Sequence, residues 1–231
     1  MPTSVRAVSL DLDNTLWETL PVLRRAEAAL AAWLAARAPR LAAAFSTEDF
    51  KHLRGELARG APERAHDLTW LRTETLRRAL LATGYAPALA EQAFEVFLAE
   101  RNTIEPYADV RPALARLARR VPLFALSNGN ACVTRVGLGE YFRGALGASS
   151  AGVAKPDARI FAQLVALTAV EPAAILHVGD DAIADVAGAR AAGLATVWIN
   201  RSGKPWPEGL QPADHEVRDL AALATLVESL S

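Results

Sequence analysis

Short apolar runs alternate with helical patterns through the second half of the chain. The first such run, residues 5–10, is interrupted only by Arg6 and Ser9, which is the composition of a short buried strand. Similar runs follow at residues 122–126, 145–148, 175–178 and 195–199. Helical patterns lie between and after them at residues 109–120, 157–168, 183–192 and from 219 onward, with Asp109 and Asp219 as expected helix caps. This alternation predicts an α/β fold with a doubly wound parallel sheet.

The segment between the first strand and this alternating region has only helical spacing. Its first helix ends before Pro39, and Ser46 followed by Asp49 has the pattern of a capping box that begins a second helix. Asp67 begins a third helix, and a fourth covers about residues 88–101. Four helices without an intervening strand predict a small bundle inserted after the first strand. The predicted domains are a Rossmann-like core, residues 1–16 and 104–231, and a four-helix insertion, residues 17–103.

Composition narrows the class of protein. A chain of 231 residues is long enough for a large core with an insertion, and a net charge of −1 with dispersed basic residues argues against nucleic acid or an anionic membrane as a partner. Cys132 is the single cysteine, so neither an intramolecular disulfide nor a Cys-based zinc cluster can form. The longest apolar run, residues 28–36, is too short to span a bilayer, and the first residues lack the apolar segment of a secretory signal. We therefore expect a cytoplasmic protein; its oligomeric state is left open.

Polar residues stand where the predicted strands end. Asp11 and Asp13 follow the first strand, and because residues i and i+2 of an extended chain share a face, their Cα atoms are about 6.6 Å apart. Ser127 follows the second strand, Asp180 follows the strand at 175–178, and Lys155 lies in a loop. Each has an ordinary explanation alone, as a turn, a helix cap or a solvated lysine. Together they favour a site, because ligands of such sheets bind outside the carboxyl ends of the strands.

The residue types at this edge indicate phosphoryl chemistry. Two carboxylates about 4 Å apart repel each other by roughly 4 kcal/mol at an effective dielectric constant near 20, so a cation is needed between Asp11, Asp13 and Asp180. All-oxygen ligands with room for water and phosphate favour Mg²⁺. With Lys155 and Ser127 nearby, the pocket suits a dianion such as a phosphoryl group. Asp11 is then the candidate nucleophile and Asp13 the candidate acid and base.

A receiver domain uses a similar set of residues, namely an acidic pair, a phospho-accepting Asp, a Ser or Thr and a Lys. In a receiver domain the acidic pair comes first, and the domain is about half as long as a 231-residue chain. Here the order is Asp-x-Asp, Ser, Lys and then Asp-Asp, with a helical insertion. This order favours an enzyme.

In this set and order, the chain resembles the haloacid dehalogenase-like hydrolase superfamily. Residues 11–15, Asp-Leu-Asp-Asn-Thr, look like its first motif, Ser127 like its second, Lys155 like its third, and residues 179–185, with Asp180, Asp181 and Asp185, like its fourth. The helical insertion is similar to the C1 cap, the substrate-specificity domain of that family. The motifs and the α/β pattern cover essentially the whole chain.

The resemblance implies a role for each matched residue. Asp11 would be the phosphorylated nucleophile and a magnesium ligand, and Asp13 the acid and base that also offers its main-chain carbonyl. Ser127, with Asn128, would bind the phosphoryl oxygens, Lys155 would neutralise nucleophile and phosphate, and Asp180 would bind the metal. Asp181 and Asp185 would support the metal ligands from behind, although the choice among Asp180, Asp181 and Asp185 stays open. Haloacid dehalogenases themselves lack the second Asp, so Asp13 favours a phosphatase.

A narrower resemblance is to the bacterial flavin-pathway phosphatases, which act on 5-amino-6-(5-phospho-D-ribitylamino)uracil and on flavin mononucleotide. It rests on the core motifs, on residues 137–142 and on residues 66–69, His-Asp-Leu-Thr, within the insertion. The expected function is a Mg²⁺-dependent phosphomonoesterase acting on a small phosphate ester. A sugar phosphomutase and a non-catalytic phosphometabolite-binding protein are the alternatives.

Overall fold

The computed structural model describes residues 4–230, so residues 1–3 and 231 of the predicted core lie outside the described part of the chain. The chain forms two compact units: one joins the segment up to Glu18 with the segment from Glu105 onward, and the other is Thr19–Ile104. The predicted boundaries, after residues 16 and 103, lie beside these. The role of the helical unit in substrate choice stays a prediction.

The first unit is built on a six-stranded parallel sheet in the order β3-β2-β1-β4-β5-β6. Its strands are β1 Ala7–Leu10, β2 Leu123–Ser127, β3 Phe142–Gly147, β4 Ile175–Gly179, β5 Ala195–Ile199 and β6 His215–Val217. The prediction of a doubly wound α/β sheet is therefore confirmed. β6 was not predicted, because three residues with Val217 as their single aliphatic side chain carry too little pattern. The strand order reverses at β1 and β4, which is where such sheets bind ligands.

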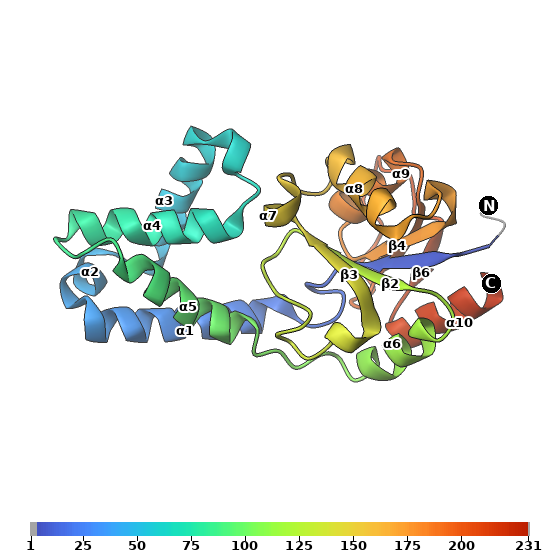
Figure 1. Ribbon diagram of the computed structural model, residues 1–231, viewed down its shortest axis with the longest axis horizontal. Helices are drawn as coiled ribbons and strands as arrows, with labels where there is room; N and C mark the ends of the chain where they lie inside the picture. Colours follow the sequence, from blue (N-terminus) through green and yellow to red (C-terminus); the bar gives the residue numbers. More distant parts are fainter. Residues whose placement is uncertain (1–3, 231) are drawn as a thin grey trace. The chain divides into compact units, whose positions relative to one another are not determined.

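Helices cover both faces of this sheet, with α8 and α9 on one side and α6 and α10 on the other (Figure 1). The helices of this unit are α6 Val110–Ala118, α7 Ala148–Ala151, α8 Ala158–Thr168, α9 Gly188–Ala191 and α10 Leu220–Leu230. α8 packs Ile160, Phe161 and Leu164 into a core cluster with Phe124 and Ile175 of the strands. Burying these side chains holds the carboxyl ends of β1, β2 and β4 in a fixed register.

The predicted helix over residues 183–192 has a different form. Residues Ala182–Ala187 make a π-helical turn, η4, before α9 begins. The N–H groups of Asp185 and Val186 both donate to the carbonyl of Asp181, at 3.0 and 3.2 Å. This wide turn brings the Asp185 carboxylate back onto the N–H of Asp181, at 3.0 Å, so the irregularity places a functional side chain.

The second unit contains the four predicted helices and one more. Its helices are α1 Thr19–Arg37, α2 Pro39–Ala44, α3 Thr47–Gly60, α4 Leu68–Ala82 and α5 Leu89–Arg101. Pro39 does end α1, but it also stands at the first position of α2, where its missing N–H costs nothing. The predicted capping box is present, since Ser46 N–H donates to Asp49 and Asp49 N–H donates to Ser46 Oγ.

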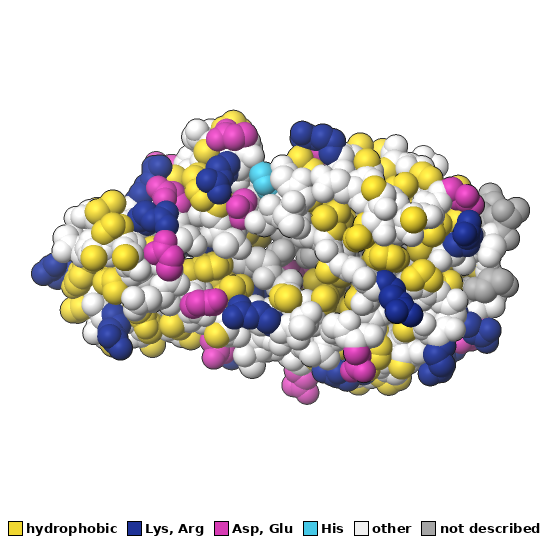
Figure 2. Space-filling view, viewed as in Figure 1, with side chains coloured by type: hydrophobic (Ala, Val, Ile, Leu, Met, Phe, Trp, Pro, Cys, Tyr) yellow, Lys and Arg dark blue, Asp and Glu magenta, His cyan; other side chains and the backbone are white. Residues whose placement is uncertain are grey.

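The surface charges are mixed in sign, and the described helices are not those of a membrane-spanning segment. On the face shown in Figure 2, basic side chains are interspersed with acidic and apolar ones. Among the described residues, no helix is both long and apolar enough to cross a membrane.

Candidate active site

Lys155 forms the centre of a buried charge cluster at the carboxyl ends of the strands. Its ammonium group donates to Asp11 Oδ1 at 2.6 Å, to Asp185 Oδ1 at 2.6 Å and to the carbonyl of Leu126 at 2.8 Å. All three charged side chains are buried. Although burial lowers it, the two carboxylates raise the pKa of Lys155 above its ordinary value, so the group stays cationic.

The two carboxylates that share Lys155 differ in their other partners. Asp185 also accepts the N–H of Asp181 at 3.0 Å and contacts His177 Nε2 at 3.3 Å. Burial raises the pKa of Asp185, but Lys155 and His177 outweigh it and hold that pKa well below its ordinary value. Burial raises the pKa of Asp11 to about 8, and Lys155 only partly opposes this. Asp185 is thus the permanent counter-ion, and Asp11 is the carboxylate whose charge needs further support.

Gly179 makes room for this arrangement. A Cβ atom at that position would lie 2.1 Å from Asp185 Oδ2. No side chain larger than hydrogen fits there without displacing the carboxylate. The glycine at the end of β4 is therefore part of the site's construction, whereas the sequence showed it only as the first residue of the stretch that resembles the fourth motif.

Three carboxylates converge on one small volume. Single oxygen atoms of Asp11, Asp180 and Asp185 lie within 4.8 Å of one another. Burial, followed by the neighbouring charges of Asp185 and Asp181, raises the pKa of Asp180 to about 6. A hard divalent cation fits this oxygen set, because it would offset the repulsion that raises these pKa values. Asp185 joins Asp180 in the cluster, whereas Asp181 accepts the N–H groups of Ile183 and Ala184 and caps η4.

The remaining predicted residues surround this cluster. Asp13 accepts a hydrogen bond from Trp17 Nε1 at 2.9 Å, which orients its carboxylate two residues after Asp11. Ser127 is buried and accepts the N–H of Gly129 at 3.0 Å. The Asn128 side chain exchanges two hydrogen bonds with the main chain of Lys155, at 2.8 and 2.9 Å. Asn128 therefore fixes the lysine loop to the end of β2, a positioning contact that sequence reasoning did not show.

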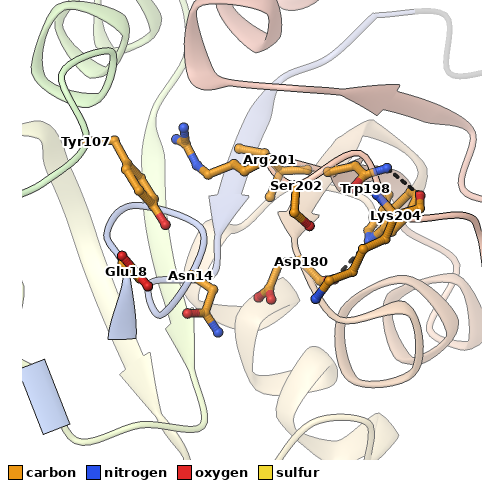
Figure 3. Close-up of a pocket in the computed structure, with 10 residues that line it drawn as sticks. Asn14, Glu18, Tyr107, Asp180, Trp198, Arg201, Ser202 and Lys204 are labelled. Atoms are coloured by element: carbon orange, nitrogen blue, oxygen red, sulfur yellow. Dashed lines mark hydrogen bonds between the residues drawn. The ribbon is translucent and has the colours of Figure 1, made fainter. Parts of the chain in front are cut away.

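A cavity of about 450 Å³ opens beside Asp180. The residues that line it are Asn14, Glu18, Tyr107, Asp180, Trp198, Ile199, Asn200, Arg201, Ser202 and Lys204. In Figure 3 the side chains of Asn14, Glu18 and Asp180 surround the same open space. Asp11 and Lys155 are absent from the lining, so Asp180 is the residue that this cavity shares with the charge cluster.

Arg201, which lines this cavity, forms a hydrogen bond to the first motif, residues 11–15. It donates to the carbonyl of Thr15 at 3.0 Å, binds both carboxylate oxygens of Asp109 at 2.9 and 3.1 Å, and stacks on the Tyr107 ring at 4.0 Å. Asp109 stands at the N-cap position of α6, as predicted, but its side chain makes no capping hydrogen bond to that helix. Its carboxylate is taken by Arg201 and by the N–H of Leu220, since a bidentate guanidinium is the stronger partner.

This parallel sheet carries a buried Asp-Lys-Asp cluster, with the carboxylate of Asp180 beside it, at the edge where enzymes of this sheet class bind their ligands. The chain belongs to the haloacid dehalogenase-like hydrolase family, whose model matches residues 5–193. The predicted family is therefore confirmed.

Relatives that cover nearly the whole chain include phosphatases. The 5-amino-6-(5-phospho-D-ribitylamino)uracil phosphatase YigB of Escherichia coli is 33% identical over 231 residues, 96% of each chain. The phosphoserine phosphatase of Thermus thermophilus is 30% identical over 241 residues, 92% of each chain. A crystal structure described as a 2-haloacid dehalogenase from Pseudomonas syringae has a TM-score of 0.94 and 37% identity over 98% of this chain and 100% of that chain. The prediction of an enzyme of this family agrees with all three.

Proposed function

We propose that the chain is a Mg²⁺-dependent phosphomonoesterase that hydrolyses a small phosphorylated metabolite through Asp11. The observation that carries the proposal is the cluster in which Lys155 bridges Asp11 and Asp185, with Asp180 alongside and Asp13 two residues after the nucleophile. One attacking carboxylate, one fixed cation and one additional carboxylate for proton transfer are the parts that phosphoryl transfer needs.

The reaction divides into two displacements. In the first, Asp11 Oδ attacks phosphorus and forms an aspartyl-phosphate as the bond to the ester oxygen breaks. Asp13 gives its proton to that leaving oxygen. In the second, Asp13 takes a proton from water, the water oxygen attacks phosphorus, and the bond between phosphorus and Asp11 breaks to release inorganic phosphate.

The other residues bind and orient the phosphoryl group. Lys155 lies 2.6 Å from Asp11 and offsets the negative charge that the nucleophile and the phosphate bring together. Ser127, the last residue of β2, would donate its hydroxyl to a phosphoryl oxygen. Asn128 would add a further donor while its amide group keeps the Lys155 loop in place. Asp11, Asp180 and the carbonyl of Asp13 would hold Mg²⁺, whose bound charge would keep Asp11 ionised and screen the phosphoryl oxygens.

Asp13 supports the phosphatase over the dehalogenase alternative. Haloacid dehalogenases lack a carboxylate at this position, as noted above, since their ester intermediate is hydrolysed without magnesium. Here the carboxylate is present and held by Trp17 at 2.9 Å. The likeness to a structure described as a 2-haloacid dehalogenase makes halide release the control reaction.

The substrate we propose is a flavin-pathway phosphate, 5-amino-6-(5-phospho-D-ribitylamino)uracil or flavin mononucleotide. The 33% identity to YigB over 96% of the chain supports it. With Mg²⁺ present, we expect stoichiometric release of inorganic phosphate from the preferred compound, measured against a panel of phosphorylated metabolites. Halide release from 2-chloropropionate without phosphate release would overturn the phosphatase proposal. Isomerised sugar phosphate without free phosphate would indicate a mutase.

The metal proposal predicts a pH-dependent gain in stability. The pKa values of Asp11 and Asp180 are raised to about 8 and about 6, so a cation must displace more protons at pH 6 than at pH 8. We therefore expect millimolar Mg²⁺ to raise the thermal midpoint more at pH 8 than at pH 6. Both folded-state values lie above the ordinary carboxyl pKa of 3.8, so without metal these groups make the protein less stable as the pH rises.

Differential scanning fluorimetry at the two pH values measures this gain. The Asp180→Asn variant should show a smaller gain at both values, while Asp157→Asn, an exposed carboxylate paired with Arg159, should respond like the wild type. An equal gain at both pH values, or an undiminished gain in Asp180→Asn, would contradict the metal site.

A further inference from the structure

A hydrogen-bonded chain runs behind the lysine through a histidine that the proposed chemistry does not use. Ser9 on β1 and His177 on β4 are register partners in the sheet, and both are fully buried. His177 Nδ1 lies 3.1 Å from Ser9 Oγ, and its Nε2 lies 3.3 Å from Asp185 Oδ1. Phe161 packs against the ring in a T-shaped arrangement, with centroids 5.5 Å apart at 83°, which restricts the orientation of the imidazole.

The partners determine the tautomer of the ring. Asp185 accepts from Lys155 and from the N–H of Asp181, so it is ionised and can only accept at His177. Nε2 must therefore carry the proton. Nδ1 of the neutral ring is then an acceptor, and the Ser9 hydroxyl is its donor. The result is a series of two hydrogen bonds in which Ser9 donates to His177 and His177 donates to Asp185.

This series of hydrogen bonds ends on Asp185 Oδ1, the oxygen atom that also accepts a hydrogen bond from Lys155. Asp185 Oδ1 receives both His177 Nε2 and Lys155 Nζ, and the lysine lies 2.6 Å from Asp11 on its other side. With one oxygen held by His177 and the other by the N–H of Asp181, the Asp185 carboxylate has little freedom to rotate. Because the Asp185 carboxylate cannot rotate freely, it holds the Lys155 ammonium group in one position. Lys155 in that position can stabilise the negative charge of Asp11, the proposed nucleophile.

We propose that His177 is a positioning residue for the hydrolytic reaction, acting through Asp185 on the lysine that supports Asp11, with the Ser9 hydroxyl bound to its other ring nitrogen. The expected effect of His177 on kcat rests on the proposed function. The hydrogen bonds from Ser9 through His177 to Asp185 do not depend on the substrate. His177 lies behind Asp185 and does not touch the phosphoryl group.

Kinetics of matched variants test the positioning role. His177→Phe removes the donor to Asp185 and should lower kcat by about 10- to 100-fold with a smaller change in KM, the range seen when such supporting partners are lost. His177→Gln keeps an N–H near the position of Nε2 and should recover most of the loss. Leu176→Ala on the same strand is the control for a purely structural defect, because it removes buried volume from the face of β4 opposite His177 and should leave kcat within a few-fold of wild type.

A spectroscopic measurement needs no substrate and so separates this proposal from the phosphatase assignment. In the ¹⁵N spectrum of the wild type, one of the four histidines of the chain should show a protonated Nε2 and an unprotonated Nδ1, assigned by its absence in His177→Gln. Ser9→Ala should shift the Nδ1 signal. The opposite tautomer in the wild type would overturn the proposal even if His177→Phe fails to fold. Wild-type kcat in His177→Phe, or no recovery in His177→Gln, would overturn it also.

Discussion

Replacing Asp11 with Asn is expected to reduce kcat by about four orders of magnitude or more, because the amide cannot attack phosphorus as a carboxylate does. The substitution preserves shape, and Lys155 keeps its bonds to Asp185 and to the carbonyl of Leu126. Burial raises the pKa of Asp11 to about 8, which means that the ionised group is costly in the folded protein. We therefore expect the metal-free thermal midpoint of Asp11→Asn to equal or exceed that of the wild type.

Lost turnover with retained stability is the combination expected when a nucleophile is replaced. Phosphate release under single-turnover conditions and the thermal midpoint are measured on the same preparation. Asp219→Asn is the matched control, since its side chain accepts the N–H of Ala222 at the start of α10 and Asn is a good cap, so kcat should stay within a few-fold of wild type. Turnover above about one per cent in Asp11→Asn would show that another group attacks.

The fold could be predicted because its signals are local. Each buried strand has a dense apolar run, as in residues 175–178, and the capping pattern of Ser46 and Asp49 appears in the structure as a reciprocal pair of hydrogen bonds. The alternation of strands and helices then leaves few topologies. β6 and α2 were missed because each is short and draws its stability from neighbours rather than from its own pattern.

The residues of the site could be predicted from the sequence, but most of the hydrogen bonds between them could not. Strand-end positions indicated that Asp11 and Asp180 would converge, since parallel strands end at one edge of a sheet. Whether Asp181 or Asp185 would join them depended on η4, and a π-helical turn has no clear sequence signal. His177 looked like one more residue of a buried strand, and its role depends on a contact between β4 and η4 that spacing does not encode.

Replacing Lys155 with Met is expected to have the largest effect on stability. Met fills a similar volume, but Asp11 and Asp185 are left buried without the cation that lies 2.6 Å from each. Removing one partner from a buried ionic cluster typically costs about 3–5 kcal/mol. We expect a loss of that order in the free energy of unfolding at pH 8 without metal, measured by urea denaturation, together with a large fall in kcat. At pH 6 the loss should be smaller, because Asp11 is then protonated in both proteins: its pKa is about 8 with Lys155 present and rises further without it.

A double-mutant cycle separates this electrostatic cost from lost packing. In Asp11→Asn/Lys155→Met one of the two uncompensated charges is gone, so the double variant should be more stable than Lys155→Met alone, with a coupling energy of about 1–3 kcal/mol. Arg159→Met removes an exposed partner of Asp157 and should change the free energy of unfolding by less than about 1 kcal/mol. If Lys155→Met is as stable as the wild type, or if the two single effects add without coupling, then the lysine does not compensate Asp11. The attacking carboxylate would then need its charge stabilised by the metal alone, and Asp185 would lose its role as the anchor of that lysine.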